Sequence, residues 1–294
     1  MNTAQERRTD VKAKLLALAL LSLTLEGCLG GSPDRGTAQV GVYLTHTATT
    51  SPLTLHASAQ EEIAEVWVNV ARVTARIDGK WVTLLQVPES EGALNLQGLR
   101  FKERLLGEKT IPAGKITEIR FELRKNEANG PLYNYVVLAD GSQLALNVPS
   151  GELKPELDLV VAKDTVVELV FDVNLDYFVE RGGDGSYNVN PRKALVFLES
   201  FRDRFASIRG EVELPNGLDQ LISMEINLFR QGHDQPIWTA HLQDGRLSFE
   251  ITSLPAGQYR LEASVEVLGA ASLTLSSGPF YLEEGSSKSV TLRS

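Results

Sequence analysis

Apolar and polar residues alternate along most of the chain from Thr37 onward, and this period of two predicts β-strands rather than helices. The apolar residues within 66–70 occupy one parity, whereas those within 73–77 occupy the other. One extra residue near Ala71 and Arg72 would keep both sets on the buried face. The pattern therefore predicts a β-bulge at that point.

Short segments that contain glycine or proline separate the predicted strands. Asp-Gly pairs at 78–79 and 140–141 favour tight hairpins, because the central residues of such turns need positive φ angles. Residues 111–114 predict a turn that enters another strand. Alternation is weaker across residues 94–106, which predicts a loop or a short helical turn there.

A second series of alternating segments begins at Ala206, after the strand-like residues 187–198. It contains about seven short strands within roughly 90 residues, a spacing typical of a β-sandwich. The two series predict an all-β fold of two tandem antiparallel β-sandwich domains, at residues 38–200 and 206–294.

The start of the chain follows a different pattern, in which basic residues precede a run of eleven residues, 15–25, that is apolar except for Ser22 and Thr24. This order is that of an export signal. The run is too short for an ordinary transmembrane helix. We predict that residues 1–27 form a lipoprotein signal peptide and that residues 28–37, which are small and polar, form a flexible tether.

The end of this run, Leu25-Glu26-Gly27-Cys28, resembles the lipobox of bacterial lipoproteins. The resemblance implies that Cys28 becomes the mature N-terminus, with a diacylglycerol thioether and usually an amide-linked acyl chain. Glu26 stands where the family usually has a small or apolar residue. Leu29, rather than Asp, follows the cysteine, and the family's sorting rule then favours the outer membrane where two membranes are present.

Cys28 is the only cysteine in the sequence, so it has no partner for an internal disulfide in an exported chain. Lipidation of Cys28 is therefore the preferred interpretation, and two or three acyl chains would hold the protein stably at the membrane. Two alternatives remain: a plain secretory signal with an incidental cysteine, and an uncleaved anchor.

Several short motifs occur in one order along the first series, at residues 63–73, 78–85, 94–96, 111–120, 148–151 and 171–173. In this order they resemble a bacterial and archaeal envelope family labelled domain of unknown function 4382, over residues 38–200. The resemblance implies a β-sandwich on an exported lipoprotein, and it supplies no catalytic residue because the family has no established activity. Residues 249–261 resemble the carboxypeptidase-regulatory-like and prealbumin-like sandwiches, which are accessory domains of bacterial surface proteins.

The sequence has 29 basic and 38 acidic residues, a formal net charge of −9, which argues against nucleic acid as a partner. Its histidines, His46, His56, His233 and His241, have neither the spacing of a zinc site nor that of a nucleophile–base pair. We interpret them as loop or surface imidazoles. Because a Gly-x-Ser-x-Gly motif is also missing from the sequence, we predict that the protein is not an enzyme.

Three oxygen-bearing side chains, Asp172, Asn174 and Asp176, are predicted to lie on one strand face, and such clusters suit Ca²⁺. They are candidate metal ligands. The segment does not match an EF-hand loop, because Tyr177 and Gly183 stand where that loop has Gly and Glu. The alternative is a polar strand face that is turned to solvent, with no metal cofactor.

Aromatic rings offer a second kind of candidate, since their faces stack on apolar patches of sugars. Trp67 and Trp81 lie within predicted hairpin strands and are assigned to the core. Trp238 is predicted to be the more exposed ring.

Together these features predict a lipid-anchored protein of the cell envelope that acts as a non-catalytic binding or structural module. Its predicted partners are the membrane, through Cys28, and an envelope protein or a glycan, contacted through sheet edges or end loops. The alternative is a glycan-active envelope enzyme or its accessory subunit.

Overall fold

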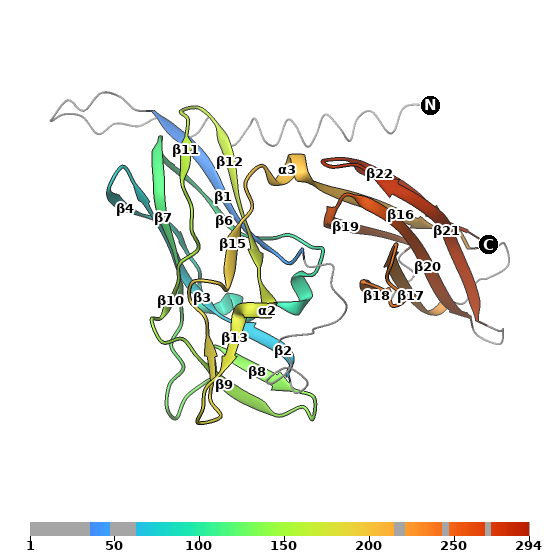
Figure 1. Cartoon of the computed structure of the whole chain (residues 1–294), viewed down its shortest axis with the longest axis horizontal. Helices are drawn as coiled ribbons and strands as arrows, with labels where there is room; N and C mark the ends of the chain where they lie inside the picture. Colours follow the sequence, from blue (N-terminus) through green and yellow to red (C-terminus); the bar gives the residue numbers. More distant parts are fainter. Residues whose placement is uncertain (1–35, 48–62, 215–220, 243–246, 268–271, 294) are drawn as a thin grey trace. The chain divides into compact units, whose positions relative to one another are not determined.

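The computed structural model describes residues 36–47, 63–214, 221–242, 247–267 and 272–293 (Figure 1). These residues form two β-sandwiches, so the predicted all-β fold is confirmed. Helical structure is limited to four short segments of the described chain: η2 (Glu89–Glu91), η3 (Gln97–Leu99), α2 (Leu175–Phe178) and α3 (Phe201–Arg204). Within the described ranges, no helix has the length and apolarity needed to cross a bilayer.

The first sandwich contains three sheets. Their strands are β1 (Thr37–Thr45), β2 (Ile63–Val68), β3 (Val70–Ile77), β4 (Lys80–Gln86), β5 (Leu94–Asn95), β6 (Arg104–Pro112), β7 (Gly114–Leu123), β8 (Tyr135–Leu138), β9 (Gln143–Asn147), β10 (Glu152–Leu153), β11 (Leu159–Val161), β12 (Val166–Val173), β13 (Val179–Arg181), β14 (Tyr187–Val189) and β15 (Leu195–Phe197). The strand orders are β15-β12-β1-β6, β10-β7-β3-β4 with β11 also beside β7, and β13-β14-β9-β8-β2-β5. One continuous core joins the three sheets, and Val42, Val73 and Val66 contribute to it from β1, β3 and β2.

Most strand pairs of this sandwich are antiparallel, as predicted, but β1 pairs with β12 and β9 with β14 in parallel. In the first of these pairs, Gln39 lies opposite Val166. Parallel neighbours need a long connection, so they are far apart in the sequence. Local alternation therefore carries no signal for such a pair.

The predicted β-bulge is confirmed at Ala71. Val70 pairs with Leu123 and Arg72 pairs with Glu122, which leaves Ala71 as the extra residue of β3. The structure adds a feature that the alternation did not predict, because β2 and β3 belong to different sheets and Asn69 joins them.

The two Asp-Gly turns are also confirmed. Asp78 and Gly79 have φ angles of 45° and 81°, and they connect β3 to β4. Asp140 and Gly141 lie between the paired strands β8 and β9. Residues 94–106 contain the short η3 as predicted, but β6 begins within them, at Arg104, where the alternation was too weak to indicate a strand.

The second sandwich contains two sheets with the orders β19-β16-β22 and β18-β17-β20-β21. Its strands are β16 (Phe205–Val212), β17 (Leu221–Arg230), β18 (Trp238–Leu242), β19 (Ser248–Pro255), β20 (Gly257–Val267), β21 (Leu273–Leu282) and β22 (Ser287–Leu292). They match the seven predicted segments. Ile208, Met224 and Leu261 are fully buried in its core.

Candidate functional site

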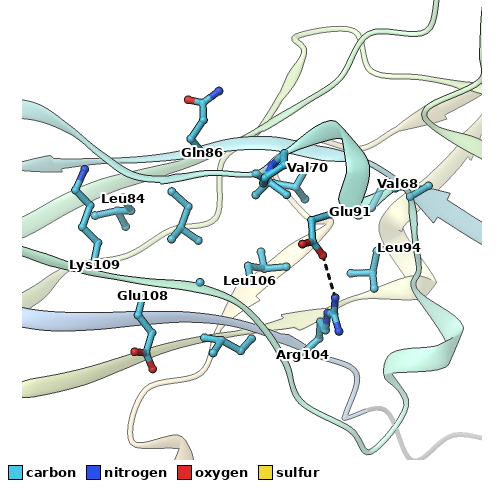
Figure 2. A pocket seen from close by; sticks show the side chains of 17 residues that line it. Val68, Val70, Leu84, Gln86, Glu91, Leu94, Arg104, Leu106, Glu108 and Lys109 are labelled. Atoms are coloured by element: carbon cyan, nitrogen blue, oxygen red, sulfur yellow. Dashed lines mark ion pairs between the residues drawn. The ribbon is translucent and has the colours of Figure 1, made fainter. Parts of the chain in front are cut away.

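A groove lies along one side of the first sandwich, between β4 and β6 (Figure 2). Each of these strands is the last in its sheet, and in the described chain no strand pairs with the edge of either that faces the groove. The groove has a volume of about 700 Å³. This volume is within the range of small-ligand and peptide-anchor pockets, about 300–1,000 Å³.

Aliphatic side chains from β2, β3, β4, β5 and β6 line the floor of the groove. Its apolar residues are Val68, Val70, Leu84, Leu85, Val87, Pro88, Ala93, Leu94, Leu105 and Leu106. Leu84 and Leu85 are consecutive and yet both are buried, because the pairing of β4 with β3 shifts between Thr83 and Leu85 and leaves Leu84 as an extra residue.

Gly107 lies on β6 in the lining of the groove, next to the side chain of Leu85. A Cβ atom at this position would lie 2.8 Å from Cδ2 of Leu85, closer than real Cβ contacts come. The absence of a side chain at Gly107 therefore allows Leu85 to pack across β6.

Charged residues lie at both ends of the groove. At one end, Arg104 Nη2 lies 3.6 Å from Glu91 Oε2, so these two charges are paired. At the other end, Lys109 Nζ donates a hydrogen bond of 2.8 Å to the main-chain oxygen of Thr83 on β4. Lys109 and Glu108 leave β6 in opposite directions (Figure 2).

Glu108 does not neutralise Lys109. It accepts a hydrogen bond of 3.0 Å from Gln39 Nε2, on the outer face of the sheet. Among the residues that the structure describes, Lys109 forms no ion pair. The groove therefore combines an apolar floor, two strand edges and one uncompensated positive charge, an arrangement suited to binding.

The candidate calcium ligands are not arranged as predicted. The strand β12 ends at Val173, and α2 begins at Leu175, so Asp172 lies on a strand, Asn174 is the residue before the helix and Asp176 lies on the helix. The prediction of one strand face is wrong, because burial of Leu175 and Phe178 turns the chain into a helical turn. Within the described ranges, no three His, Cys, Asp or Glu residues are grouped to hold a metal ion.

Asp172 is held by the protein itself. Its Oδ1 accepts a hydrogen bond of 2.7 Å from the main-chain N–H of Thr47. Burial raises the pKa of the Asp172 carboxyl to about 6, although the bonds to Thr47 oppose this effect. Two other residues near the predicted cluster bind local partners, because Glu180 accepts from Asn190 and Asp184 from Ser186.

His46 is buried beside Asp172, and the prediction of a loop or surface imidazole is wrong for it. Only 6% of this residue is exposed. Its Nδ1 donates to the main-chain oxygen of Val173 over 2.8 Å, and lies 4.0 Å from Asp172 Oδ1. Burial, together with the charge of Arg100, lowers the pKa of His46 to about 4.

The sequence contained a signal for this burial. His46 has the same parity as Val42 and Leu44, both of which face the core. Of the other histidines, His241 is exposed and His233 half-buried, whereas His56 lies outside the described residues.

The tryptophans are also placed differently from the prediction. Trp81 is 45% exposed, and the guanidinium carbon of Arg120 lies 4.1 Å from the centre of its ring. Trp67 is half-buried and stacks on Tyr135 at 5.8 Å. Trp238 is half-buried against the second core rather than being the more exposed ring. Trp81 occupies the outward parity of β4, and this explains its exposure.

The groove residues were missed at the sequence level. Arg104 belongs to the stretch with weak alternation and Lys109 follows it, and the proximity of both to β4 depends on how two sheets face each other. Cys28, the predicted lipidation site, lies outside the described residues.

A family model described as Domain of unknown function (DUF4382) matches residues 37–191, more than half of the chain. The protein belongs to the DUF4382 family. This agrees closely with the resemblance found over residues 38–200. No curated protein matches the sequence of this DUF4382 member.

Several solved structures were compared with this DUF4382 protein. A leucine-rich repeat protein from Bacteroides thetaiotaomicron is 11% identical with a TM-score of 0.20; the match covers 87% of this chain but only 26% of that one. A Bacteroides ovatus protein provisionally assigned as an adhesin is 12% identical with a TM-score of 0.21, covering 88% of both chains. GBS52, the minor pilin of Streptococcus agalactiae, is 11% identical with a TM-score of 0.20, covering 87% of this chain and 94% of that one. Scores this low carry no argument about function.

Proposed function

We propose that the protein is a non-catalytic binding module of the cell envelope, that a lipid on Cys28 holds it at the membrane, and that the groove between β4 and β6 is its contact surface. The observation that carries this proposal is the groove. Two strand edges flank an apolar floor there, and unpaired edges are ready templates for contact with another chain.

The side chains that line the groove favour binding over catalysis. Its titratable groups are Glu91, Arg104, Glu108 and Lys109, and each of them has a hydrogen-bond or ion-pair partner within the protein. The lining residues include no histidine, cysteine or serine that would act as a base or a nucleophile.

The anchor and the domain division belong to the same proposal. Residues 1–27 would be removed, and residues 28–37 would then hold the DUF4382 sandwich away from the outer membrane. Residues 206–294 would serve as an accessory sandwich of the carboxypeptidase-regulatory-like or prealbumin-like kind. The support is the lipobox at Leu25-Glu26-Gly27-Cys28 and the resemblance of residues 249–261.

Mass spectrometry of the native protein tests the anchor. The expected mature N-terminus is Cys28 with a diacylglycerol thioether and an amide-linked acyl chain. A free thiol together with an intact leader would contradict the proposal.

A turnover screen against envelope glycans and esters tests the non-catalytic role. No product is expected from either substrate class. Reproducible turnover would favour the alternative, a glycan-active envelope enzyme, and would require its active site to be mapped by substitution.

A further inference from the structure

We infer that the groove between β4 and β6 binds an extended polypeptide segment that carries a carboxylate. Its main chain pairs with the open edge of β6, its apolar side chains cover the groove floor, and its carboxylate meets Lys109. The inference rests on the proposed function only in taking this groove as the contact surface.

The strand edges indicate a polypeptide. β1 pairs with one edge of β6, from Thr37 opposite Pro112 to Leu44 opposite Arg104. Alternate residues of an antiparallel strand direct their N–H and C=O groups to the other edge, which here faces the groove. An extended peptide offers complementary groups at the same spacing, about 3.4 Å per residue, whereas an acyl chain would leave these groups unpaired.

The floor indicates which side chains the segment needs. Leu84 and Leu85 are buried beneath the groove, whereas Leu94 and Leu106 are half-buried in its wall. Side chains of an extended segment point to opposite sides in alternation. Every second residue of the segment therefore faces the groove, and an apolar residue at those positions removes the exposed parts of Leu94 and Leu106 from water.

The charge at the Lys109 end indicates a carboxylate. Lys109 shares its parity on β6 with the buried Ile111, so it projects between the two sheets rather than outward. Its ammonium group donates to the neutral carbonyl of Thr83, whereas Arg104 at the opposite end is already paired with Glu91. A carboxylate from the segment would replace a neutral acceptor with a charged one, and bonds to charged acceptors are stronger.

The overall charge limits how acidic the segment is. The sequence has a formal net charge of −9, so a strongly acidic partner would be repelled at long range. A segment with a single carboxylate and otherwise uncharged, alternating residues can pair with Lys109 and avoids strong repulsion by the negative charge of the protein.

Lysine on an edge strand has another established use, which is to prevent two edges from pairing. The two roles predict different results for Lys109→Met, which keeps the aliphatic stem and removes the charge. If Lys109 only prevents edge pairing, Lys109→Met should self-associate, and its affinity for peptides should not change.

The test is selection of random twelve-residue peptides displayed on phage against the full chain, followed by binding titrations of the enriched peptides. We expect enrichment of sequences with apolar residues at alternate positions and one Asp or Glu. Lys109→Met should weaken their binding about tenfold, the effect of losing a charge-assisted hydrogen bond. Ala93→Arg, which places a long side chain in the groove, should abolish binding.

Matched controls are Lys80→Met, at the exposed hairpin tip, and Ala139→Arg, at the exposed turn before β9. Both should bind the enriched peptides as the unmodified protein does, and circular dichroism should show all four variants folded. The inference is overturned if no peptide is enriched, if the enriched peptides lack a carboxylate, or if Lys109→Met and Ala93→Arg bind unchanged. These results are independent of the state of Cys28, so they are distinguishable from failure of the lipid anchor.

Discussion

His46 is buried and its neighbour Asp172 is largely so, and their proton equilibria act on the free energy of unfolding in opposite directions. The pKa of His46 falls from its ordinary value of 6.5 to about 4 in the folded protein. As the pH falls through this interval, the unfolded chain binds the proton before the folded protein does, so the free energy of unfolding decreases. The pKa of Asp172 rises from 3.8 to about 6 in the folded protein. As the pH falls from 6 towards 3.8, the folded protein binds the proton before the unfolded chain does, so the free energy of unfolding increases. The two contributions largely cancel between about pH 4 and pH 6.

The variant Asp172→Asn separates these two contributions. It keeps an oxygen acceptor for the N–H of Thr47 and removes a charge that is largely shielded from water, so we expect it to exceed the unmodified protein in stability by about 1–3 kcal/mol near pH 7. The advantage should shrink as the pH falls towards 4. Urea unfolding at several pH values measures this, with Asp203→Asn at an exposed position of α3 as the control. Parallel pH curves for Asp172→Asn and the unmodified protein would refute the assignment.

Position 210 requires glycine, because a neighbouring ring occupies the space of a side chain. A Cβ atom at Gly210 would overlap the ring of Phe249, the residue opposite it on β19. We expect Gly210→Ala to lower the free energy of unfolding by about 1–3 kcal/mol, as overpacking does. In a Phe249→Ala background the same change should cost less than about 0.5 kcal/mol.

Gly183→Ala is the matched control for this cycle, because no atom lies within 4 Å of the position that its Cβ would occupy. Thermal unfolding of the four proteins of the cycle, and of the control, provides the measurement. An equal cost of Gly210→Ala in both backgrounds would show that Phe249 is not the obstacle.

At the level of strands, the passage from β2 to β3 depends on a polar network. The N–H of Asn69, which is 2% exposed, donates to Asn134 Oδ1 over 3.0 Å, and Arg124 Nε donates to Asn69 Oδ1 over 3.0 Å. Asn134 Nδ2 in turn donates to the main-chain oxygen of Arg124. The network therefore satisfies the main chain where it leaves one sheet for another.

Asn134→Ala should destabilise the first sandwich by about 2–4 kcal/mol, because it leaves the buried N–H of Asn69 and the partly buried C=O of Arg124 without the Asn134 side chain as partner. Asn147→Ala, at an exposed position of β9, should change the stability by less than about 0.5 kcal/mol. Urea unfolding compares the two. Equal effects of both substitutions would mean that the network contributes little.

The residues at the end of β12 are not expected to bind calcium. Because Asp172, Asn174 and Asp176 lie on different elements and Asp172 already accepts from Thr47, we expect a chelator to leave the melting temperature unchanged. Differential scanning calorimetry with and without chelator is the measurement. A lower melting temperature after chelation, restored by added Ca²⁺, would reinstate this cluster as a metal site.

For the whole chain, the lipid is expected to decide location. Cys28→Ser removes the thiol that would carry the lipid, so the variant should move from the membrane fraction to the soluble fraction of expressing bacteria. Glu26→Ala is the control, because it brings the lipobox closer to the family pattern and should stay in the membrane fraction. Retention of Cys28→Ser in the membrane fraction would mean that something other than this lipid attaches the protein.

Much of the strand pattern was predictable because its causes are local. Alternation marks which face of a strand is buried, the parity change near Ala71 requires an extra residue, and the pair Asp78-Gly79 supplies the positive φ angles of a tight turn. The candidate site was not predictable by the same means. The edge strand β6 begins in a stretch with weak alternation, the facing of β4 and β6 has no local signal, and the calcium cluster failed because α2 replaces a strand.

The amino-acid pattern alone thus determined the all-β class, the two tandem series, the hairpins and the membership of the DUF4382 family. Folding in three dimensions determined that β1 lies beside β12, that Asp172 lies beside the buried His46, and that Lys109 faces the edge of β4. The physical reason is the range of the forces involved. Side-chain periodicity and turn geometry act between neighbours in sequence. Desolvation and sheet-edge contacts join residues that are far from one another in the sequence, 26 positions apart for Thr83 and Lys109 and 125 for Thr47 and Asp172.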